Sequence, residues 1–259
     1  ISIMLRSLIE AARKEKDILL MTHLVLGYPS FEENFKAIQA MSDAGVELIE
    51  LQIPFSEPTA DGPVILKANG IAIENGTKVS QCFEFAEKAC KEFPDISFLF
   101  MTYYNIVFVK GEKEFAEKSK NIGMKGFIIP DLPPEEAENW LAICKEQSLE
   151  SIFIYTPTHK KERLNEIANV SSGFIYCVGR RGVTGKKTAF DQSIADQIAQ
   201  YKSSTDLPLA LGFGVQSKED VDFLKGKVDI AVIGSKAIEI HETAGAEAIK
   251  DFLQTIRSD

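Results

Sequence analysis

The regular alternation of short apolar runs with longer amphipathic stretches is the feature that most restricts how this chain can fold. Each apolar run is bounded by Gly, Pro or Asp, as expected of strands that are buried on both faces. We predict eight such strands, at Ile18–Leu26, Val46–Ile53, Ile96–Met101, Gly126–Ile129, Ser151–Tyr155, Gly173–Val178, Pro208–Gly212 and Val228–Ile233.

The stretches between these runs have an apolar period close to 3.6 residues, which predicts amphipathic helices. Capping patterns support several of the helix starts, with Glu33 following Ser30 and Asp220 following Ser217. The predicted helices are Phe31–Ala44, Ser80–Phe93, Glu114–Ile122, Pro134–Glu146, Lys160–Asn169, Ala189–Tyr201, Ser217–Leu224 and Ala244–Ile256.

Alternating strands and helices give parallel strands joined by right-handed crossovers. Eight repeats in about 250 residues fit a closed (β/α)8 barrel, and an open doubly wound sheet is the structural alternative. We therefore expect an α/β fold, with a single TIM-barrel domain over residues 1–259. The segment ISIMLRSLIEAARKEKD has apolar residues at helical spacing and predicts an extra N-terminal helix.

The charge balance narrows the function classes. The 259 residues include 29 Lys and Arg against 38 Asp and Glu, a net charge of −9, which does not suit a nucleic-acid or anionic-membrane binder. No apolar run reaches the roughly 18 residues of a membrane span, and the N-terminal segment lacks a signal-peptide pattern. We expect a cytoplasmic protein without a metal site, with reduced thiols at Cys82, Cys90, Cys144 and Cys177.

Two carboxylates are candidate acid–base groups. Apolar residues of the second predicted strand alternate with Glu50 and Gln52, so Glu50 faces the barrel interior if the apolar set faces the helices. A desolvated carboxyl there suits proton transfer near neutral pH, whereas a structural ion pair with a buried Arg or Lys is the open alternative. Asp61 is either a second carboxylate at the strand mouth or a turn residue. We interpret His23, in the first strand, as a core histidine.

Glycines after the last two predicted strands indicate a phosphate site. Gly212-Phe213-Gly214 follows the seventh strand, and Gly234-Ser235 follows the eighth. Glycines allow the backbone to approach an anion, and helix N-termini present free N–H groups. Phosphate groups commonly bind between these two strands in α/β barrels, although tight turns alone would also explain the glycines. We expect the Ser235 hydroxyl to contact the phosphate.

The remaining candidates lie on the loop after the sixth strand and at strand ends. The loop GRRGVTGKKT indicates a lid that orders over a ligand, with Gly185 as a further backbone donor, although a plain flexible loop is the alternative. Aromatic residues at strand ends suit a flat apolar substrate, or they simply fill the core. These residues are Tyr103, Tyr176 and Phe213.

Six segments together resemble the tryptophan synthase α subunit family, and they cover nearly the whole chain in order: ELQIPFSEPTADGP, TYYNIVF, GFIIPDLP, GRRGVTG, LGFGVQS and AVIGSKAI. The resemblance implies a (β/α)8 lyase of tryptophan biosynthesis that reversibly cleaves 1-C-(indol-3-yl)glycerol 3-phosphate to indole and D-glyceraldehyde 3-phosphate. It also implies an αββα complex in which indole passes through a tunnel to a β subunit. Pyridoxal phosphate would belong to the β subunit, and no cofactor to this chain.

The resemblance assigns roles to individual residues. Glu50 would protonate indole C3 and shuttle the proton, and Asp61 would stabilise positive charge at the indole nitrogen. Tyr176 would line the indole pocket, with Tyr103 as a further substrate contact. Thr184 on the lid would reach the carboxylate loop when the site closes. Backbone N–H groups would hold the phosphate around Gly185, Phe213, Gly214, Gly234 and Ser235.

Departures from the family pattern bear on the rate and on the details of the pocket. Gln52 stands where the family usually has glycine, on the same strand face as Glu50, so its side chain could crowd the site. Other departures are His23, Val25, Glu57, Thr59 and Arg181, the last within the lid Arg180–Thr188.

Two alternative functions remain open. The first is another phosphate-binding barrel enzyme, such as indole-glycerol-phosphate synthase, but that chemistry would want a buried lysine and none lies in the eight predicted strands. The second, favoured only by Gln52, is a catalytically weak barrel that activates a partner subunit.

Overall fold

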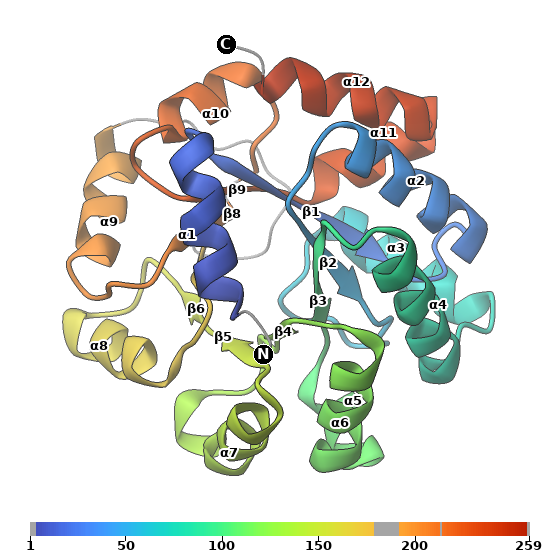
Figure 1. The fold of residues 1–259 in the computed structure, drawn as a ribbon, viewed down its shortest axis with the longest axis horizontal. Helices are drawn as coiled ribbons and strands as arrows, with labels where there is room; N and C mark the ends of the chain where they lie inside the picture. The colour runs from blue at the N-terminus through green and yellow to red at the C-terminus, as the bar shows by residue number, and fades with distance from the viewer. Residues whose placement is uncertain (1–3, 179–191, 213, 258–259) are drawn as a thin grey trace.

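A parallel barrel forms the centre of the molecule. The structure is a computed structural model that describes residues 4–178, 192–212 and 214–257, and within these ranges nine strands form one sheet in the order β5-β4-β3-β2-β1-β9-β8-β7-β6. Phe153 alone separates the edge strands β5 and β6 in the chain, so the sheet closes on itself (Figure 1). The strands are β1 Leu19–Val25, β2 Leu48–Gln52, β3 Ser97–Met101, β4 Gly126–Ile128, β5 Glu150–Ile152, β6 Ile154–Tyr155, β7 Ile175–Val178, β8 Leu209–Gly212 and β9 Ile230–Ile233.

This topology confirms the predicted TIM barrel and refines one strand. The predicted strand Ser151–Tyr155 is divided, because its first part pairs with β4 and its second part pairs with β7. The Phe153 carbonyl between the two parts still accepts a hydrogen bond from the Tyr176 N–H. The short strands β5 and β6 together therefore occupy the position of one strand in an eight-stranded barrel.

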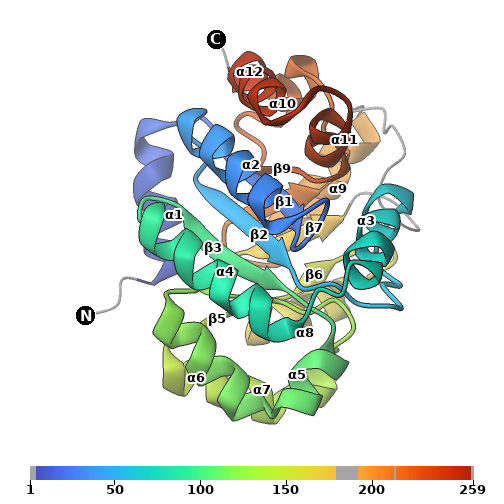
Figure 2. The ribbon, with the colours of Figure 1, turned by 90° about the vertical axis from the view of Figure 1, so that its right-hand side faces the viewer.

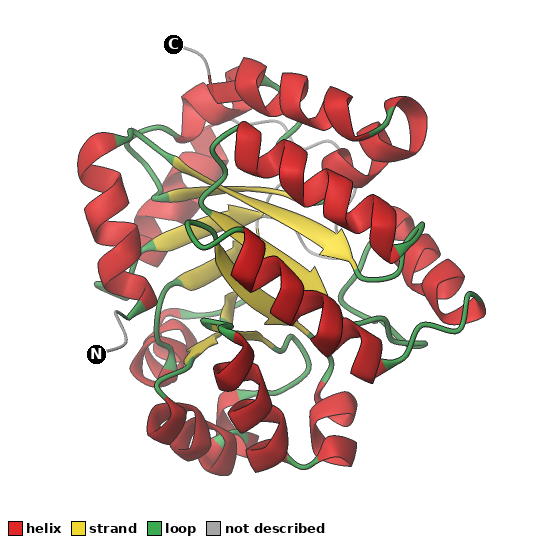
Figure 3. Ribbon diagram, turned by 45° about the vertical axis from the view of Figure 1, so that its right-hand side comes forward, coloured by secondary structure: helices red, strands yellow, loops and turns green. Residues whose placement is uncertain are grey.

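Helices surround the strands (Figure 3). Their bounds are α1 Leu5–Glu15, α2 Phe31–Asp43, α3 Pro63–Glu74, α4 Val79–Glu92, α5 Tyr104–Lys110, α6 Glu112–Ile122, α7 Glu138–Gln147, α8 Lys161–Val170, α9 Gln192–Lys202, α10 Lys218–Leu224, α11 Ser235–Ala244 and α12 Ala246–Arg257. The turn Pro134–Glu136 is a 3-10 helix that Ala137 separates from α7, so the predicted helix Pro134–Glu146 is two elements. The helices α3 and α5 were not predicted from the sequence, and α11 was expected only as a helical segment without bounds after Gly234-Ser235. None of the described helices is long and apolar enough to cross a membrane.

Two of the predicted helix caps form as expected. The Ser30 hydroxyl accepts a hydrogen bond from the backbone N–H of Glu33 at the start of α2. Ser217 and Asp220 form a reciprocal capping box at the start of α10. Each cap satisfies N–H groups that the helix itself leaves without a partner, which fixes where the helix begins.

Strand residues alternate between two apolar layers. The helices cover the outside of the strands (Figure 2). Ile49, Leu51 and Ile53 pack outward against them, whereas Leu48 packs inside the barrel. The interior cluster also contains Leu5 and Ile9, so α1 closes one end of the barrel. Burying a side chain of this size contributes about 2 kcal/mol, which makes α1 part of the core rather than an appendage.

Strand register brings the first functional side chains together. His23 of β1 lies beside Glu50 of β2, which in turn lies beside Leu99 of β3. Because neighbouring residues of parallel strands point to the same side, His23 and Glu50 both point into the barrel. The inward direction predicted for Glu50 is therefore confirmed by the register.

Candidate active site

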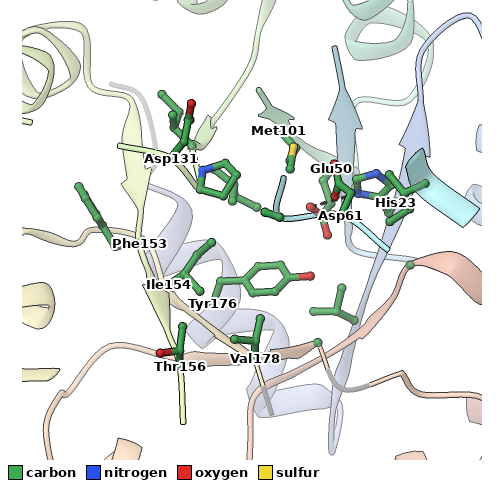
Figure 4. Close-up of a pocket in the computed structure, with 18 of the residues that line it drawn as sticks. His23, Glu50, Asp61, Met101, Asp131, Phe153, Ile154, Thr156, Tyr176 and Val178 are labelled. Carbon is green, nitrogen blue, oxygen red and sulfur yellow. Dashed lines mark ion pairs between the residues drawn. The ribbon is translucent and has the colours of Figure 1, made fainter. Parts of the chain in front are cut away.

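A cavity of about 560 Å³ opens at the carboxyl ends of the strands. Its walls include Glu50 and Asp61 on the side of β1 to β3, and Gly214, Gly234 and Ser235 on the side of β8 and β9. Figure 4 shows Tyr176 pointing across this space, with its hydroxyl directed toward the two carboxylates. In TIM barrels this face carries the active site, so the cavity is the candidate catalytic pocket.

The two predicted carboxylates share one wall of the cavity. Glu50 is 2% exposed and Asp61 is 8% exposed, and both side chains face the pocket (Figure 4). The buried partner of Glu50 is His23, whose Nδ1 lies 3.3 Å from Glu50 Oε2. The alternative expected from the sequence, an ion pair with a buried Arg or Lys, is not what Glu50 forms; its buried partner is histidine. Asp61 is more than a turn residue, because its carboxylate is held within the site.

Hydrogen bonds fix Asp61 from two sides. Gln52 Nε2 donates to Asp61 Oδ2 at 2.7 Å, and the Tyr103 hydroxyl donates to the same oxygen at 2.9 Å. Tyr103 itself is buried, accepts from the Ala60 N–H and stacks on Phe55 with ring centroids 5.1 Å apart. Tyr103 therefore lies behind Asp61 and orients it.

The Gln52 side chain turns away from the open cavity. It is fully buried, and its Oε1 lies 2.7 Å from His23 Nε2. The amide thus bridges His23 to Asp61 behind the wall instead of projecting into the space for a ligand. This placement explains why a large side chain is accommodated next to Glu50.

Burial and charge shift the pKa values of this wall in known directions. Burial raises the pKa of the Asp61 carboxyl, and this effect outweighs the opposing influence of His23, Gln52 and Tyr103. Burial alone would lower the pKa of His23, but the charges of Glu50 and Asp61 and the hydrogen bonds reverse the sign, so the His23 pKa is raised. His23 and Asp61 therefore hold their protons more tightly than exposed groups of the same kinds would.

Tyr176 spans the cavity because Gly212 leaves room for it. A Cβ atom on Gly212 would lie 2.7 Å from the Tyr176 hydroxyl, closer than nonbonded atoms can approach. Burial, followed by the negative charges of Glu50 and Asp61, raises the pKa of the phenol, which stays neutral. Gly212 was predicted as part of a phosphate loop, whereas the structure shows that it makes space for the aromatic ring.

Opposite the carboxylates, the cavity wall includes glycines and the N-terminus of a helix. Gly214 has a φ of 73°, in the left-handed region that glycine favours. Helix α11 begins at Ser235, and no side chain caps its N-terminal residue Gly234. The Ala237 N–H donates to the Gly234 carbonyl, which leaves the N–H groups of Ser235 and Lys236 at the start of α11 for an anion in the cavity.

Three predicted contacts lie outside the described residues. These are Thr184, Gly185 and Phe213, together with the lid Arg180–Thr188 and Arg181.

Several cavity residues were not singled out from the sequence. They lie after β4 and β6 and include Asp131, Thr156, His159 and Arg163. Burial and then the charge of Arg163 lower the pKa of His159, so this imidazole is the neutral one near pH 7. Their position just beyond strand ends is the signal that could have identified them. Among the described residues, no three His, Cys, Asp or Glu side chains are grouped to hold a metal ion.

Comparisons with known proteins agree with this geometry. The family model described as tryptophan synthase alpha chain matches residues 9–257. The tryptophan synthase alpha chain of Syntrophotalea carbinolica is 50% identical over 254 residues, covering 98% of this chain and 100% of that protein. Among solved structures, Mycobacterium tuberculosis tryptophan synthase superposes with a TM-score of 0.90 at 29% identity, covering 98% of each chain. The tryptophan synthase complex of Pyrococcus furiosus gives a TM-score of 0.84 at 28% identity, covering 93% of this chain and 98% of that one.

Proposed function

Because this chain belongs to the tryptophan synthase alpha chain family, we propose that it reversibly cleaves 1-C-(indol-3-yl)glycerol 3-phosphate to indole and D-glyceraldehyde 3-phosphate. The observation that carries the proposal is the pair of buried carboxylates, Glu50 and Asp61, facing a cavity whose opposite wall is a helix N-terminus. In this cavity, the helix N-terminus suits the phosphate of the substrate, and the side with the carboxylates suits its aromatic end. The reaction is that of a lyase in L-tryptophan biosynthesis.

Substrate binding divides between the two walls. The phosphate binds to the backbone N–H groups around Gly214, Gly234 and Ser235, where the first turn of α11 favours negative charge. The indole ring lies against Tyr176, with its N–H directed to Asp61. The proposal keeps Thr184, Gly185 and Phe213 as further substrate contacts, whereas Tyr103, expected from the sequence to touch the substrate, lies buried behind Asp61 and orients that carboxylate instead.

Cleavage then needs one proton delivered and one removed. Glu50 gives its proton to indole C3, and the ring nitrogen becomes positively charged, which the Asp61 carboxylate stabilises. The bond between C3 and the first glycerol carbon breaks as Glu50 takes the proton of that carbon's hydroxyl group. The bond electrons restore the aromatic indole, the aldehyde forms, and Glu50 is again protonated, now with the proton from the hydroxyl group.

A β subunit is the expected partner of this chain. Related chains occur in tryptophan synthase complexes, such as the one from Pyrococcus furiosus. Phe108 and Val109 on α5 are 67% and 74% exposed, and α5 follows directly from the carboxyl end of β3 at the cavity face. Exposed apolar side chains beside the site suit a docking surface. We propose an αββα tetramer, with pyridoxal phosphate in the β subunit and no cofactor in this chain.

Two further expectations stay part of the proposal. Residues 1–259 form a single domain, consistent with the interior cluster that joins α1 to strands from β1 to β9. The chain works in the cytoplasm, consistent with free thiols at all four cysteines.

Indole release from the phosphorylated substrate tests the proposal. The rate is followed spectrophotometrically with and without the β subunit of the same organism, because isolated α chains of this family are feeble enzymes. We expect indole release that rises with the β subunit. If the chain binds the β subunit and stimulates it but releases no indole, it is a catalytically weak activator, and the proposed reaction is wrong.

A further inference from the structure

A continuous line of polar contacts runs behind the carboxylate wall. Glu50 Oε2 lies 3.3 Å from His23 Nδ1, and His23 Nε2 lies 2.7 Å from Gln52 Oε1. Gln52 Nε2 then donates to Asp61 Oδ2, which also accepts the Tyr103 hydroxyl hydrogen. The exposed fractions of these side chains range from 0% to 8%, so water does not compete for the bonds. The two catalytic carboxylates are therefore coupled through His23 and Gln52.

The Gln52 amide fixes which nitrogen of His23 carries a hydrogen. Gln52 Nε2 faces two acceptors, Asp61 Oδ2 at 2.7 Å and Asn69 Oδ1 at 3.5 Å, so the amide nitrogen belongs on that side. Gln52 Oε1 then faces His23, and an oxygen can only accept. His23 Nε2 therefore donates, and the ring meets Glu50 through Nδ1.

This orientation leaves one proton to be shared between His23 and Glu50. In one form, the imidazolium Nδ1–H donates to an ionised Glu50. In the other form, a protonated Glu50 donates to the neutral Nδ1. The contact without that proton would set two lone pairs against each other in a buried site, which is unfavourable.

The second oxygen of Glu50 remains for the substrate. Glu50 Oε1 is buried and has no hydrogen-bond partner among the described residues, while Glu50 lines the cavity. A buried carboxylate oxygen without a partner is costly, and it is satisfied when a ligand supplies a hydrogen-bond donor. Glu50 thus presents one oxygen to the histidine and the other to the reaction.

We propose that His23 is a positioning residue that stores, jointly with Glu50, the proton that Glu50 delivers to indole C3. This inference rests on the proposed function. Before the reaction the pair holds one proton. The proton passes from Nδ1 to Glu50 Oε2, and rotation of the carboxyl group about its Cγ–Cδ bond turns the protonated oxygen toward C3. Delivery of the proton to C3 then leaves neutral His23 and ionised Glu50. Glu50 then takes the hydroxyl proton as the C–C bond breaks, and the pair again holds one proton.

The surroundings determine how this store depends on pH. The other titratable side chains facing the pair are Asp61 from the loop after β2, Tyr103 from the end of β3 and Tyr176 from β7. The interior residue of β9 nearest the mouth, Val232, is apolar. Because the His23 pKa is raised, the stored proton is present below that pKa and is lost as the pH rises through it.

The pH dependence of kcat for indole release tests the proposal in the complex with the β subunit. Replacing His23→Gln keeps a polar side chain but removes the titrating ring. We expect the alkaline limb to move at least one unit to lower pH, which is about a tenfold loss of kcat on that limb, with KM nearly unchanged. An equal loss at every pH, or no loss, would mean that His23 is only structural.

A neighbouring substitution provides the matched control. Thr22 precedes His23 on β1 but faces outward, where its hydroxyl lies 3.1 Å from the Met41 sulfur. We expect Thr22→Val to keep the wild-type pH profile of kcat. That result would show that the altered profile of His23→Gln comes from loss of the titrating ring and not from a general disturbance of β1.

A titration of the His23 ring by nitrogen NMR gives a readout that needs no turnover. The chain has three histidines, so the signal lost in His23→Gln identifies His23. We expect Glu50→Gln to lower the His23 pKa by at least one unit. An unchanged His23 pKa would overturn the inference even if the wild-type chain releases indole. Coupled titration without any indole release would instead overturn the proposed function and leave the coupling in place.

Discussion

The two walls of the cavity use different parts of the polypeptide. The wall from β1 to β3 is made of buried polar side chains, Glu50, Asp61 and their partners, each held by another side chain. The wall from β8 to α11 includes the glycines Gly214 and Gly234 and the N-terminus of α11. Side chains can carry and shift protons, whereas backbone groups can only bind. The contrast indicates that one wall performs the chemistry and the other holds the substrate.

After the loss of Glu50 itself, Asp61→Asn should have the largest effect on the rate of the reaction. Loss of the charge opposite the indole nitrogen is expected to lower kcat about 10²- to 10³-fold, with little change in phosphate binding. Because the Asp61 pKa is raised, its ionisation above its ordinary pKa costs folding free energy, so the variant should melt no lower than wild type near pH 7. Indole release and thermal melting measure both effects.

Glu57→Gln is the matched control for Asp61→Asn, because it removes a negative charge from the same loop. Glu57 lies on the same loop but is exposed. In the chain without its partner this variant should release indole at the wild-type rate. Comparable losses in both variants would show that the loop's charge, rather than the position of Asp61, is what matters.

Gly212→Ala should have the next largest effect, because it disturbs the element that joins the two walls. The added Cβ would meet the Tyr176 hydroxyl and force the ring aside. We expect kcat/KM to fall by about one to two orders of magnitude, equivalent to about 1.4–2.8 kcal/mol. Gly70→Ala, on α3 with open space around its Cβ position, should leave kcat/KM unchanged. Equal activity of the two variants would contradict the role assigned to Gly212.

Phe108→Asp probes the surface outside both walls. Burying an aromatic side chain often dominates an interface, so we expect affinity for the β subunit to fall about tenfold or more. The basal indole release of the free chain should not change. Gln200→Glu, which adds the same charge on the exposed face of α9, should bind the β subunit normally. Undiminished binding by Phe108→Asp would place the partner elsewhere.

Ser235→Ala should have the smallest effect. In the proposed complex the Ser235 hydroxyl adds one hydrogen bond to a phosphate that backbone N–H groups also hold, so we expect KM to rise a few-fold while kcat stays constant. Ser80→Ala on α4 is the control, since Ser80 is exposed on the outside of the barrel. A selective loss of kcat would mean that the backbone wall also takes part in the chemistry.

Patterns along a single strand were sufficient to predict the direction of Glu50. The alternation around Glu50 has period two, and the barrel imposes the same period on the side chains. The sequence pattern did not predict contacts between side chains on different strands. His23 was interpreted as a core histidine, and it is indeed buried, but its pairing with Glu50 depends on the register of β1 against β2. Nothing in either strand alone specifies that register.

Local rules also explain which helices were missed. Pro63 begins α3 at its first turn, yet it closes a proline-rich loop that gives no helical period. The helix α5 has only seven residues, too few for a clear amphipathic pattern. Gln52 was expected to crowd the site because only its strand face was known. Its actual contacts depend on Asp61 and His23, which are distant in sequence or on another strand.

Glu50→Gln tests the division between a chemical wall and a binding wall most directly. The rate of indole release in a single turnover and the affinity for the phosphorylated substrate are measured on the same complex with the β subunit. We expect the rate to fall about 10²- to 10⁴-fold, because the proton carrier is lost, while substrate affinity stays within a few-fold of wild type. A wild-type rate in this variant would contradict the account and assign the proton transfer to a group other than Glu50.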